Sequence, residues 1–135
     1  MEPHNFAAPA IRKQLLVADD DESVCALLGA ALHTQCDVVA VCDAETALDR
    51  LSSGGRFDAI VSDFMLPGIS GLEFVSRVRE GETAARIPIL MISGHGYIGS
   101  AAHAAGADAF LDKPFTIAQL RSAIDSLLEP RRQAA

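Results

Sequence analysis

The chain has 135 residues, half of them hydrophobic, which suits one folded domain with its own core. It carries 11 basic and 18 acidic residues, and this net charge of −7 argues against direct binding of nucleic acid. No apolar run approaches the roughly 18 residues of a membrane span. Met1 to Ala10 lack the basic and apolar regions of a signal peptide. We therefore expect a globular, cytoplasmic protein.

Five short apolar runs predict the strands of a sheet. In chain order they are Leu15–Ala18, Val38–Val41, Ala59–Val61, Ile89–Ile92 and Ala109–Leu111. The segments between and after these runs have apolar residues at helical spacing, which predicts amphipathic helices. The helical stripes are Val24, Leu27, Leu28, Ala31 and Leu32; Ala44, Ala47, Leu48 and Leu51; Leu72, Val75 and Val78; and Ile117, Leu120, Ile124, Leu127 and Leu128.

The helix between the last two strands is predicted within about residues 97–105, where the sequence is rich in alanine. The last helix opens with Thr116 and Gln119 at the spacing of a capping box, in which each residue bonds the other's backbone. It should end before Pro130, because the residue before a proline disfavours helical geometry.

Strands that alternate with helices of this length predict a doubly wound α/β fold, a (βα)5 parallel sheet with helices on both faces. Right-handed crossovers leave few strand orders, and one of them is the flavodoxin-like order 2-1-3-4-5. We expect an N-terminal extension over 1–13, the domain over 14–129 and a short tail over 130–135. The odd number of cysteines predicts free, partly buried thiols in a reducing compartment: Cys25, Cys36 and Cys42.

Three acidic residues, Asp19, Asp20 and Asp21, directly follow the first apolar run. Carboxylates gathered at a strand end repel one another unless a cation lies among them, and hard cations such as Mg²⁺ prefer oxygen ligands. In open α/β sheets, ligands bind outside the carboxyl ends of the strands. The triplet alone fits equally well a helix cap at Asp21 beside two solvated carboxylates.

Polar side chains also follow the third, fourth and fifth runs. Asp63 ends the third, Ser93 ends the fourth and Lys113 comes shortly after the fifth. In the order 2-1-3-4-5, Asp63 would face Asp19 and Asp20 across neighbouring strands. Each of these residues alone fits an ordinary turn or loop. Together they predict a site of carboxylates, a hydroxyl and an ammonium group at one edge of the sheet.

These residues, in this order and spacing, resemble the pattern of response regulator receiver domains, the phospho-acceptor modules of two-component signalling. The family has an acidic pair after its first strand, an acceptor aspartate after its third, Ser or Thr after its fourth and Lys-Pro after its fifth. The resemblance covers roughly Gln14 to Glu129.

The resemblance implies that Asp63 is phosphorylated and that Mg²⁺ is bound by the Asp20 and Asp63 side chains and the backbone carbonyl of Met65. Asp19 would act mainly through bound water. Lys113 would pair with the acceptor carboxylate and then with a phosphoryl oxygen.

Ser93 would bond another phosphoryl oxygen, and Phe110 occupies the family's switch-aromatic position, although it also fits a plain core residue. The side chains of Met65 and His95 stand where the family tunes phosphoryl lifetime, and His95 fits a solvated loop residue equally well. The Lys113–Pro114 bond is implied to be cis. Gly94, Gly96 and Gly99 fit a mobile connection after the fourth strand.

The implied phosphoryl donor is a histidine kinase or a phosphotransfer protein. Phosphorylation would switch the face formed by the alanine-rich helix, the fifth strand and the last helix, where a protein target or a second copy of the chain would bind. The module would be a monomer or a phosphorylation-dependent homodimer. We expect no output domain in the chain and no enzymatic activity beyond self-catalysed phosphotransfer and autodephosphorylation.

Two alternatives remain at this stage. Asp19 and Asp21 match the Asp-x-Asp spacing of haloacid-dehalogenase-like phosphatases, but Ser23 stands where those enzymes carry Thr, and no cap insertion is present. The second alternative is a pseudo-receiver that binds a partner without being phosphorylated. The complete set of acidic pair, acceptor, hydroxyl and lysine argues against it.

Overall fold

The computed structural model describes residues 12–81, 86–94 and 99–129. Its centre is a five-stranded sheet in the order β2-β1-β3-β4-β5, with every neighbouring pair parallel. The strands are β1 (Lys13–Ala18), β2 (Cys36–Val41), β3 (Ala59–Asp63), β4 (Ile89–Ser93) and β5 (Ala109–Asp112). The predicted doubly wound sheet and its strand order are confirmed.

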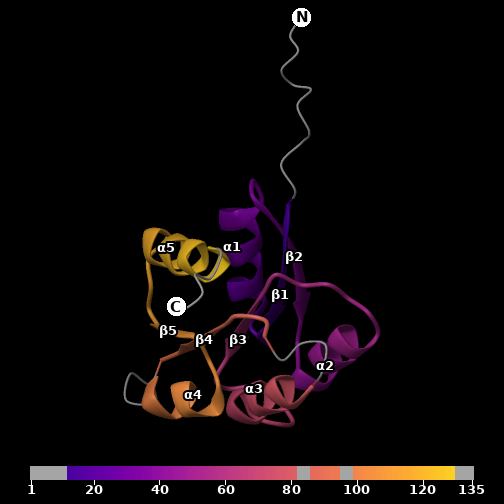
Figure 1. Cartoon of the computed structure of the whole chain (residues 1–135). Coiled ribbons are helices and arrows are strands. Elements are labelled where there is room, and N and C mark those ends of the chain that lie inside the picture. The colour runs from indigo at the N-terminus through magenta and orange to yellow at the C-terminus, as the bar shows by residue number, and fades with distance from the viewer. Residues whose placement is uncertain (1–11, 82–85, 95–98, 130–135) are drawn as a thin grey trace, which may run out of the picture.

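Five helices alternate with the strands and cover both faces of the sheet (Figure 1). They are α1 (Glu22–Leu32), α2 (Ala44–Ser52), α3 (Gly71–Glu80), α4 (Gly99–Ala105) and α5 (Ile117–Leu128). Helices α1 and α5 pack on one face through one buried cluster, and α2 and α3 pack on the other through a second. Helix α4 lies beside α3 (Figure 1).

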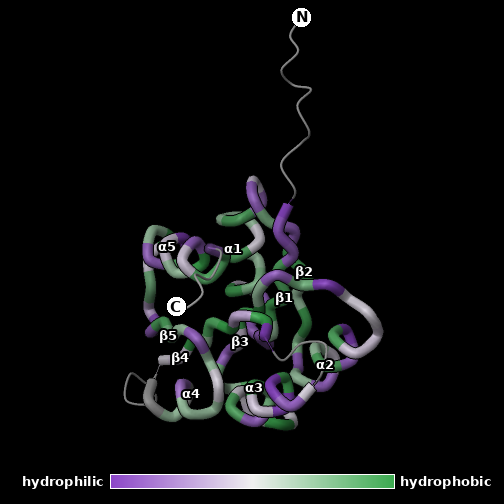
Figure 2. Tube along the Cα trace, in the orientation of Figure 1, coloured by the Kyte–Doolittle hydropathy of each residue, from purple (hydrophilic) through white to green (hydrophobic). Residues whose placement is uncertain are grey.

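The central strands are apolar because both of their faces are covered. Every residue of β3 and β4 is buried, and so are Leu15–Ala18 of β1. In Figure 2 the strands of the sheet are mainly hydrophobic, whereas the helices carry both hydrophobic and polar residues. Phe74 of α3 is the largest fully buried side chain.

Local signals set the helix ends where the sequence predicts them. The Asp21 carboxylate accepts a bond of 2.9 Å from the Ser23 amide and caps α1. Thr116 and Gln119 form the complete capping box of α5, with bonds of 2.8 and 3.0 Å. Helix α5 ends at Leu128, before Pro130.

Strands β1 and β2 each begin two residues earlier than their apolar runs. The guanidinium of Arg12 holds this edge together, donating to the carbonyls of His33 and Cys36 and to the Asp37 carboxylate at 2.8 Å. Hydrogen bonds from the side chains of Gln14 and Arg12 hold the pKa of Asp37 below its ordinary value. The hydrogen bonds of Arg12 join residues more than 20 positions apart, so the local sequence pattern cannot predict them.

All three cysteines are free, as predicted, but the prediction that they are partly buried is wrong for one of them. Cys36 is buried and Cys25 is half-buried, whereas Cys42 is exposed because it lies just beyond the end of β2. His95 and Gly96, most of the expected extension and the expected tail lie outside the described residues. Within the described ranges, no helix is both long and apolar enough to cross a membrane.

Candidate functional site

The strand register brings four strand ends to one edge of the sheet. Ala18 pairs with Ser62, so Asp19 follows at the level of Asp63. Asp63 pairs with Ile92, and Ser93 in turn pairs with Asp112, the residue before Lys113. Parallel pairing therefore brings together polar residues from Asp19 to Lys113, which are almost a hundred positions apart in the sequence.

Three carboxylates meet at this edge. One oxygen from each of Asp19, Asp20 and Asp63 lies within 4.8 Å of the others. Asp19 and Asp63 are buried, at 2% and 7% exposure, whereas Asp20 is exposed. Two buried carboxylates and one open to solvent form a group of oxygen donors that a cation could reach from the solvent side.

The buried carboxylates are held in an environment that disfavours their charge. Burial is the main cause that raises the pKa of Asp19 from 3.8 to about 6, and the nearby charge of Asp63 adds to it. The amide of Asp21 donates to Asp19 at 2.9 Å and lowers that pKa in part. Burial also raises the pKa of Asp63, against the opposing charge of Lys113 and the amides of Met65 and Phe64. A divalent cation would relieve this stored repulsion.

Lys113 supplies positive charge to the group. Its Nζ lies 3.6 Å from Oδ2 of Asp63, and its side chain is 31% exposed. The backbone amide of Lys113 donates to the Ser93 carbonyl at 2.8 Å, which ties the residue to the end of β4. The Lys113–Pro114 peptide bond is cis, as the resemblance implied.

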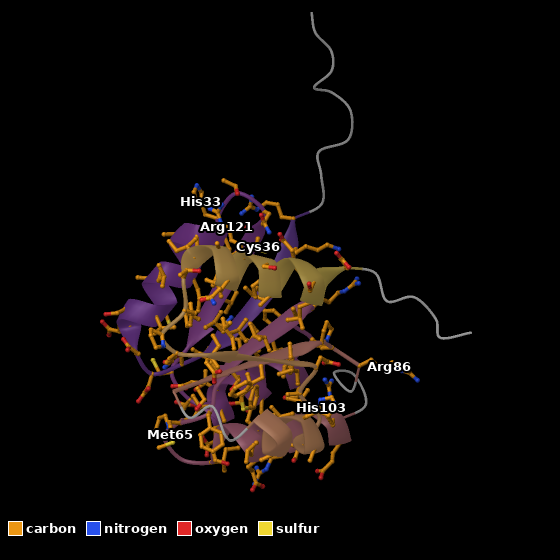
Figure 3. The ribbon with its side chains drawn as sticks, turned by 90° about the vertical axis from the view of Figure 1, so that its left-hand side faces the viewer. His33, Cys36, Met65, Arg86, His103 and Arg121 are labelled. Carbon is orange, nitrogen blue, oxygen red and sulfur yellow. The ribbon has the colours of Figure 1, made fainter. Side chains whose placement is uncertain are left out.

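The remaining predicted residues differ in their surroundings. Ser93 is buried at the end of β4, at 1% exposure. The Met65 side chain is 61% exposed and points away from the molecule (Figure 3). Phe110 is half-buried against the cluster under α2 and α3, and it borders a hollow of about 220 Å³ lined also by His103 and Ala107. His95 lies outside the described residues.

Backbone packing around Asp63 is the part that sequence reasoning missed. The Ser62 hydroxyl donates to the Asp63 carbonyl at 3.0 Å, and the Gly71 amide donates to the Phe64 carbonyl at 3.0 Å. A Cβ on Gly71 would lie 2.3 Å from the Asp63 carbonyl oxygen, so only glycine lets α3 begin this close to the end of β3. The glycine itself was the available signal, directly after the cap residue Ser70.

The donor set fits Mg²⁺. Carboxylate oxygens are hard ligands, and Mg²⁺ takes few protein ligands and keeps several waters. No histidine or cysteine joins the three carboxylates in the one candidate metal cluster found among the described residues.

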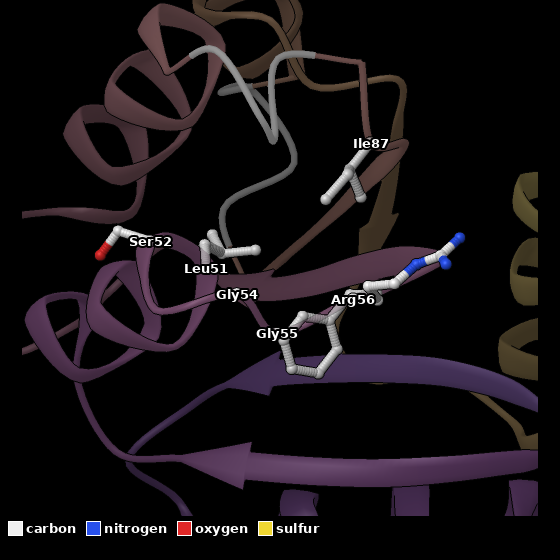
Figure 4. A pocket seen from close by; sticks show the side chains of 7 residues that line it. Leu51, Ser52, Gly54, Gly55, Arg56 and Ile87 are labelled. Carbon is white, nitrogen blue, oxygen red and sulfur yellow. The ribbon is translucent and has the colours of Figure 1, made fainter.

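A larger hollow lies elsewhere. It measures about 360 Å³ and is lined by the end of α2, the α2–β3 connection and Ile87, which precedes β4 (Figure 4). These segments precede β3 and β4, so the hollow lies at the amino ends of the strands, opposite the carboxylates. It holds none of the predicted site residues.

The sequence profile of the response regulator receiver domain matches residues 15–125. The chain belongs to the response regulator receiver domain family. Chemotaxis protein CheY-3 of Vibrio cholerae is 36% identical over 90 residues, which cover 64% of this chain and 68% of the relative. The cyclic di-GMP phosphodiesterase response regulator RpfG of Xanthomonas campestris is 34% identical over 124 residues, 89% of this chain and 33% of the relative.

This receiver domain thus spans a third to less than a half of several curated relatives that it matches, which include the transcriptional regulatory protein TcrA of Mycobacterium tuberculosis. Among solved structures, a response regulator of Chloroflexus aurantiacus superposes with a TM-score of 0.84 at 31% identity, covering 89% of this chain and all of the other. The receiver domain of a Pseudomonas aeruginosa sensor histidine kinase has a TM-score of 0.80 at 25% identity, with the same coverage. That structure has a magnesium ion coordinated in its active-site cleft.

The raised pKa of Asp19 predicts that the metal-free receiver domain is more stable at mildly acidic pH than at neutral pH. Between pH 3.8 and about 6 the folded protein keeps a proton that the unfolded chain releases, so this group's contribution to stability falls as the pH rises through that window. In EDTA, thermal unfolding at pH 5 should therefore occur at a higher temperature than at pH 7. At pH 7, Mg²⁺ at a hundred times its Kd should add about 2.7 kcal/mol.

Asp19→Asn is the matched control, because it removes the titrating group and keeps a side chain of similar size. The difference in unfolding temperature between pH 5 and pH 7 should be smaller in this variant than in the wild type. An equal difference in both proteins would assign the pH dependence to other groups.

Proposed function

We propose that this domain acts in the cytoplasm as a phospho-acceptor, taking a phosphoryl group onto Asp63 from a histidine kinase or a phosphotransfer protein. The observation that carries the proposal is the pairing of Asp63 with Lys113 at 3.6 Å inside a group of three carboxylates. A buried aspartate with both a lysine and a cation site beside it is arranged to meet a second negatively charged reactant.

Asp20, Asp63 and the backbone carbonyl of Met65 would hold Mg²⁺, and Asp19 would bind it through water. The ion would reduce the repulsion between a carboxylate nucleophile and a phosphoryl group and orient the two. Asp19 keeps its orientation through the Asp21 amide, and Asp63 through the amides of Met65 and Phe64.

In the transfer, a carboxylate oxygen of Asp63 forms a bond to phosphorus while the bond to the donor's leaving group breaks. The transition state is loose, so the protein contributes mainly position and charge. The Lys113 ammonium neutralises a phosphoryl oxygen, and its flexible stem lets it follow that oxygen. The hydroxyl of Ser93, at the neighbouring strand end, donates to another.

Phosphorylation would then shift an equilibrium between two conformations. Ser93 moves toward the phosphoryl group and Phe110 turns inward, which reshapes the face of α4, β5 and α5. The half-buried ring of Phe110 and the 220 Å³ hollow beside it support this step, because a ring needs adjacent space to change its rotamer. A target protein or a second copy of the chain would bind this face.

The domain is proposed to be no enzyme beyond its own phosphotransfer and autodephosphorylation. The contacts of Asp21 favour this over a phosphatase with an Asp-x-Asp motif. Its carboxylate accepts from the Ser23 amide as a helix cap, and it is absent from the metal cluster found among the described residues. Small phosphomonoesters should accordingly show no turnover.

The test is incubation of the wild-type chain with acetyl phosphate and Mg²⁺, followed by intact mass measurement. We expect one phosphoryl adduct, which EDTA prevents. Borohydride reduction converts an aspartyl phosphate to homoserine, and peptide sequencing should find homoserine at position 63. Homoserine at position 19 or 20, or an adduct that forms equally well in EDTA, would contradict the proposal.

A further inference from the structure

Two cysteine-bearing segments flank the backbone of Asp19, next to the carboxylates. Cys25, in the first turns of α1, donates its thiol hydrogen to the Asp19 carbonyl, with Sγ 3.4 Å from the oxygen. On the other side, the Asp19 amide donates to the Val41 carbonyl at 3.0 Å, and Cys42 is the next residue. One peptide segment of the acidic site is therefore held between two cysteine-bearing segments.

Cys25 and alternate residues of β2 lie on the same face of the sheet. Alternate residues of a strand share a face, and Cys36 and Val38 of β2 pack in the cluster under α1 and α5. Cys42 continues this series of alternate residues one position past the end of β2. Cys25 packs against the same cluster from α1. Burial raises the pKa of the Cys25 thiol, and the nearby charges of Asp19 and Cys42 raise it further.

Cys42 and Cys25 differ in their exposure to solvent, which indicates the order in which they would react. Cys42 is exposed and is the more accessible of the two to a dissolved oxidant, whereas Cys25 is half-buried. The third cysteine, Cys36, is buried near the opposite end of β2, about 20 Å from Cys42 along the strand at roughly 3.3 Å per residue. It offers a control on the same strand.

We propose that Cys25 and Cys42 form a reversible disulfide that weakens Mg²⁺ binding at the acidic site. With oxidised glutathione as oxidant, the Cys42 thiolate attacks one sulfur and releases one glutathione thiolate. The Cys25 thiolate then attacks the mixed disulfide and releases the second. Two protein thiols are oxidised and one glutathione disulfide is reduced, and the two thiol protons pass to solvent. Disulfides of this kind in reducing compartments serve as transient redox sensors.

The disulfide acts on the site through Asp19. Oxidation removes the thiol hydrogen that Cys25 donates to the Asp19 carbonyl, and it ties the start of α1 to the end of β2. Loss of an outer contact typically weakens metal binding by about 10–100-fold, and we expect about tenfold here. The effect on Mg²⁺ binding rests on the proposed function, whereas formation of the disulfide does not.

The first test is chemical. The full chain is treated with oxidised glutathione, its free thiols are alkylated, and the intact mass is measured. The wild type should lose two hydrogens and retain one alkylatable thiol. Cys36→Ala should still close the bond. Cys25→Ser, which keeps a hydroxyl donor toward the Asp19 carbonyl, should instead retain one glutathione on Cys42.

Peptide assignment needs a protease that cuts after acidic residues. Trypsin leaves all three cysteines in one peptide, since no Lys or Arg lies between Lys13 and Arg50. Cleavage after Asp37 separates Cys42 from the other two, and fragmentation of the linked pair then distinguishes Cys25 from Cys36. Glutathione retained on the wild type, a bond to Cys36 or a disulfide between two chains would overturn the proposal.

The second test titrates Mg²⁺ into the reduced and oxidised proteins and follows backbone amide NMR shifts. An apparent Kd about tenfold higher in the oxidised protein supports the coupling, and equal values overturn it. If neither form binds Mg²⁺, the proposed function is wrong. Formation of the disulfide is tested independently by the mass measurement.

Discussion

Replacing Asp63 with asparagine is expected to abolish the phosphoryl adduct formed from acetyl phosphate. A carboxylate oxygen is the proposed nucleophile, and an amide of the same size offers no comparable oxygen. Intact mass after incubation with Mg²⁺ measures the effect. Asp49→Asn, on the exposed side of α2, is the matched control and should leave the adduct at its wild-type level.

Asp63 is also a proposed metal ligand, so loss of the adduct alone would not separate its two roles. Asp20→Asn separates them, because it removes a neighbouring carboxylate of the same cluster and leaves the nucleophile in place. We expect this variant to be phosphorylated slowly and to recover as Mg²⁺ is increased, whereas Asp63→Asn should remain unmodified at every concentration. Recovery of the Asp63→Asn adduct at high Mg²⁺ would show that another residue is the acceptor.

The sequence predicts the central strands well because their burial on both faces makes their residues apolar up to the polar carboxyl ends. It predicts the edge strand β2 less well. In β2 the exposed Asp37 interrupts the apolar pattern, so the strand's first two residues escape notice, although Cys36 is buried and the strand is paired along its length. The exposure of Cys42 is misjudged for another reason, because it lies one residue past the correctly predicted end of β2.

The site residues are found in the sequence because each follows a predicted strand. Their proximity is a different matter. It depends on β1 lying beside β3, which the apolar pattern allows and only the family resemblance selects. The contacts that hold the site are less visible still, since the amides on Asp63 and the close approach of Gly71 come from backbone geometry. Sequence therefore predicts which groups take part more readily than what orients them.

Replacing Lys113 with glutamine is expected to slow phosphorylation by about 10²–10³-fold, the usual cost of losing one group that stabilises developing charge in a transition state. Glutamine keeps most of the side chain's length and removes its charge. The Lys113 charge lowers the pKa of Asp63 against the effect of burial, so the variant should also raise that pKa. Less of the nucleophile would then be ionised at a given pH.

The chain offers a matched control, because its two lysines lie at opposite ends of the strands. Lys13 is at the amino ends and Lys113 at the carboxyl ends. Lys13 begins β1 and is exposed, so Lys13→Gln removes the same charge from the protein without touching the site. The phosphorylation rate should be followed from pH 5 to pH 8 in both variants. In Lys113→Gln the ionisation that limits the rate should move to higher pH than in the wild type, while Lys13→Gln should keep the wild-type profile. A uniform decrease without that displacement would mean that Lys113 acts on the phosphoryl group alone and leaves the ionisation of Asp63 to burial and its backbone amides.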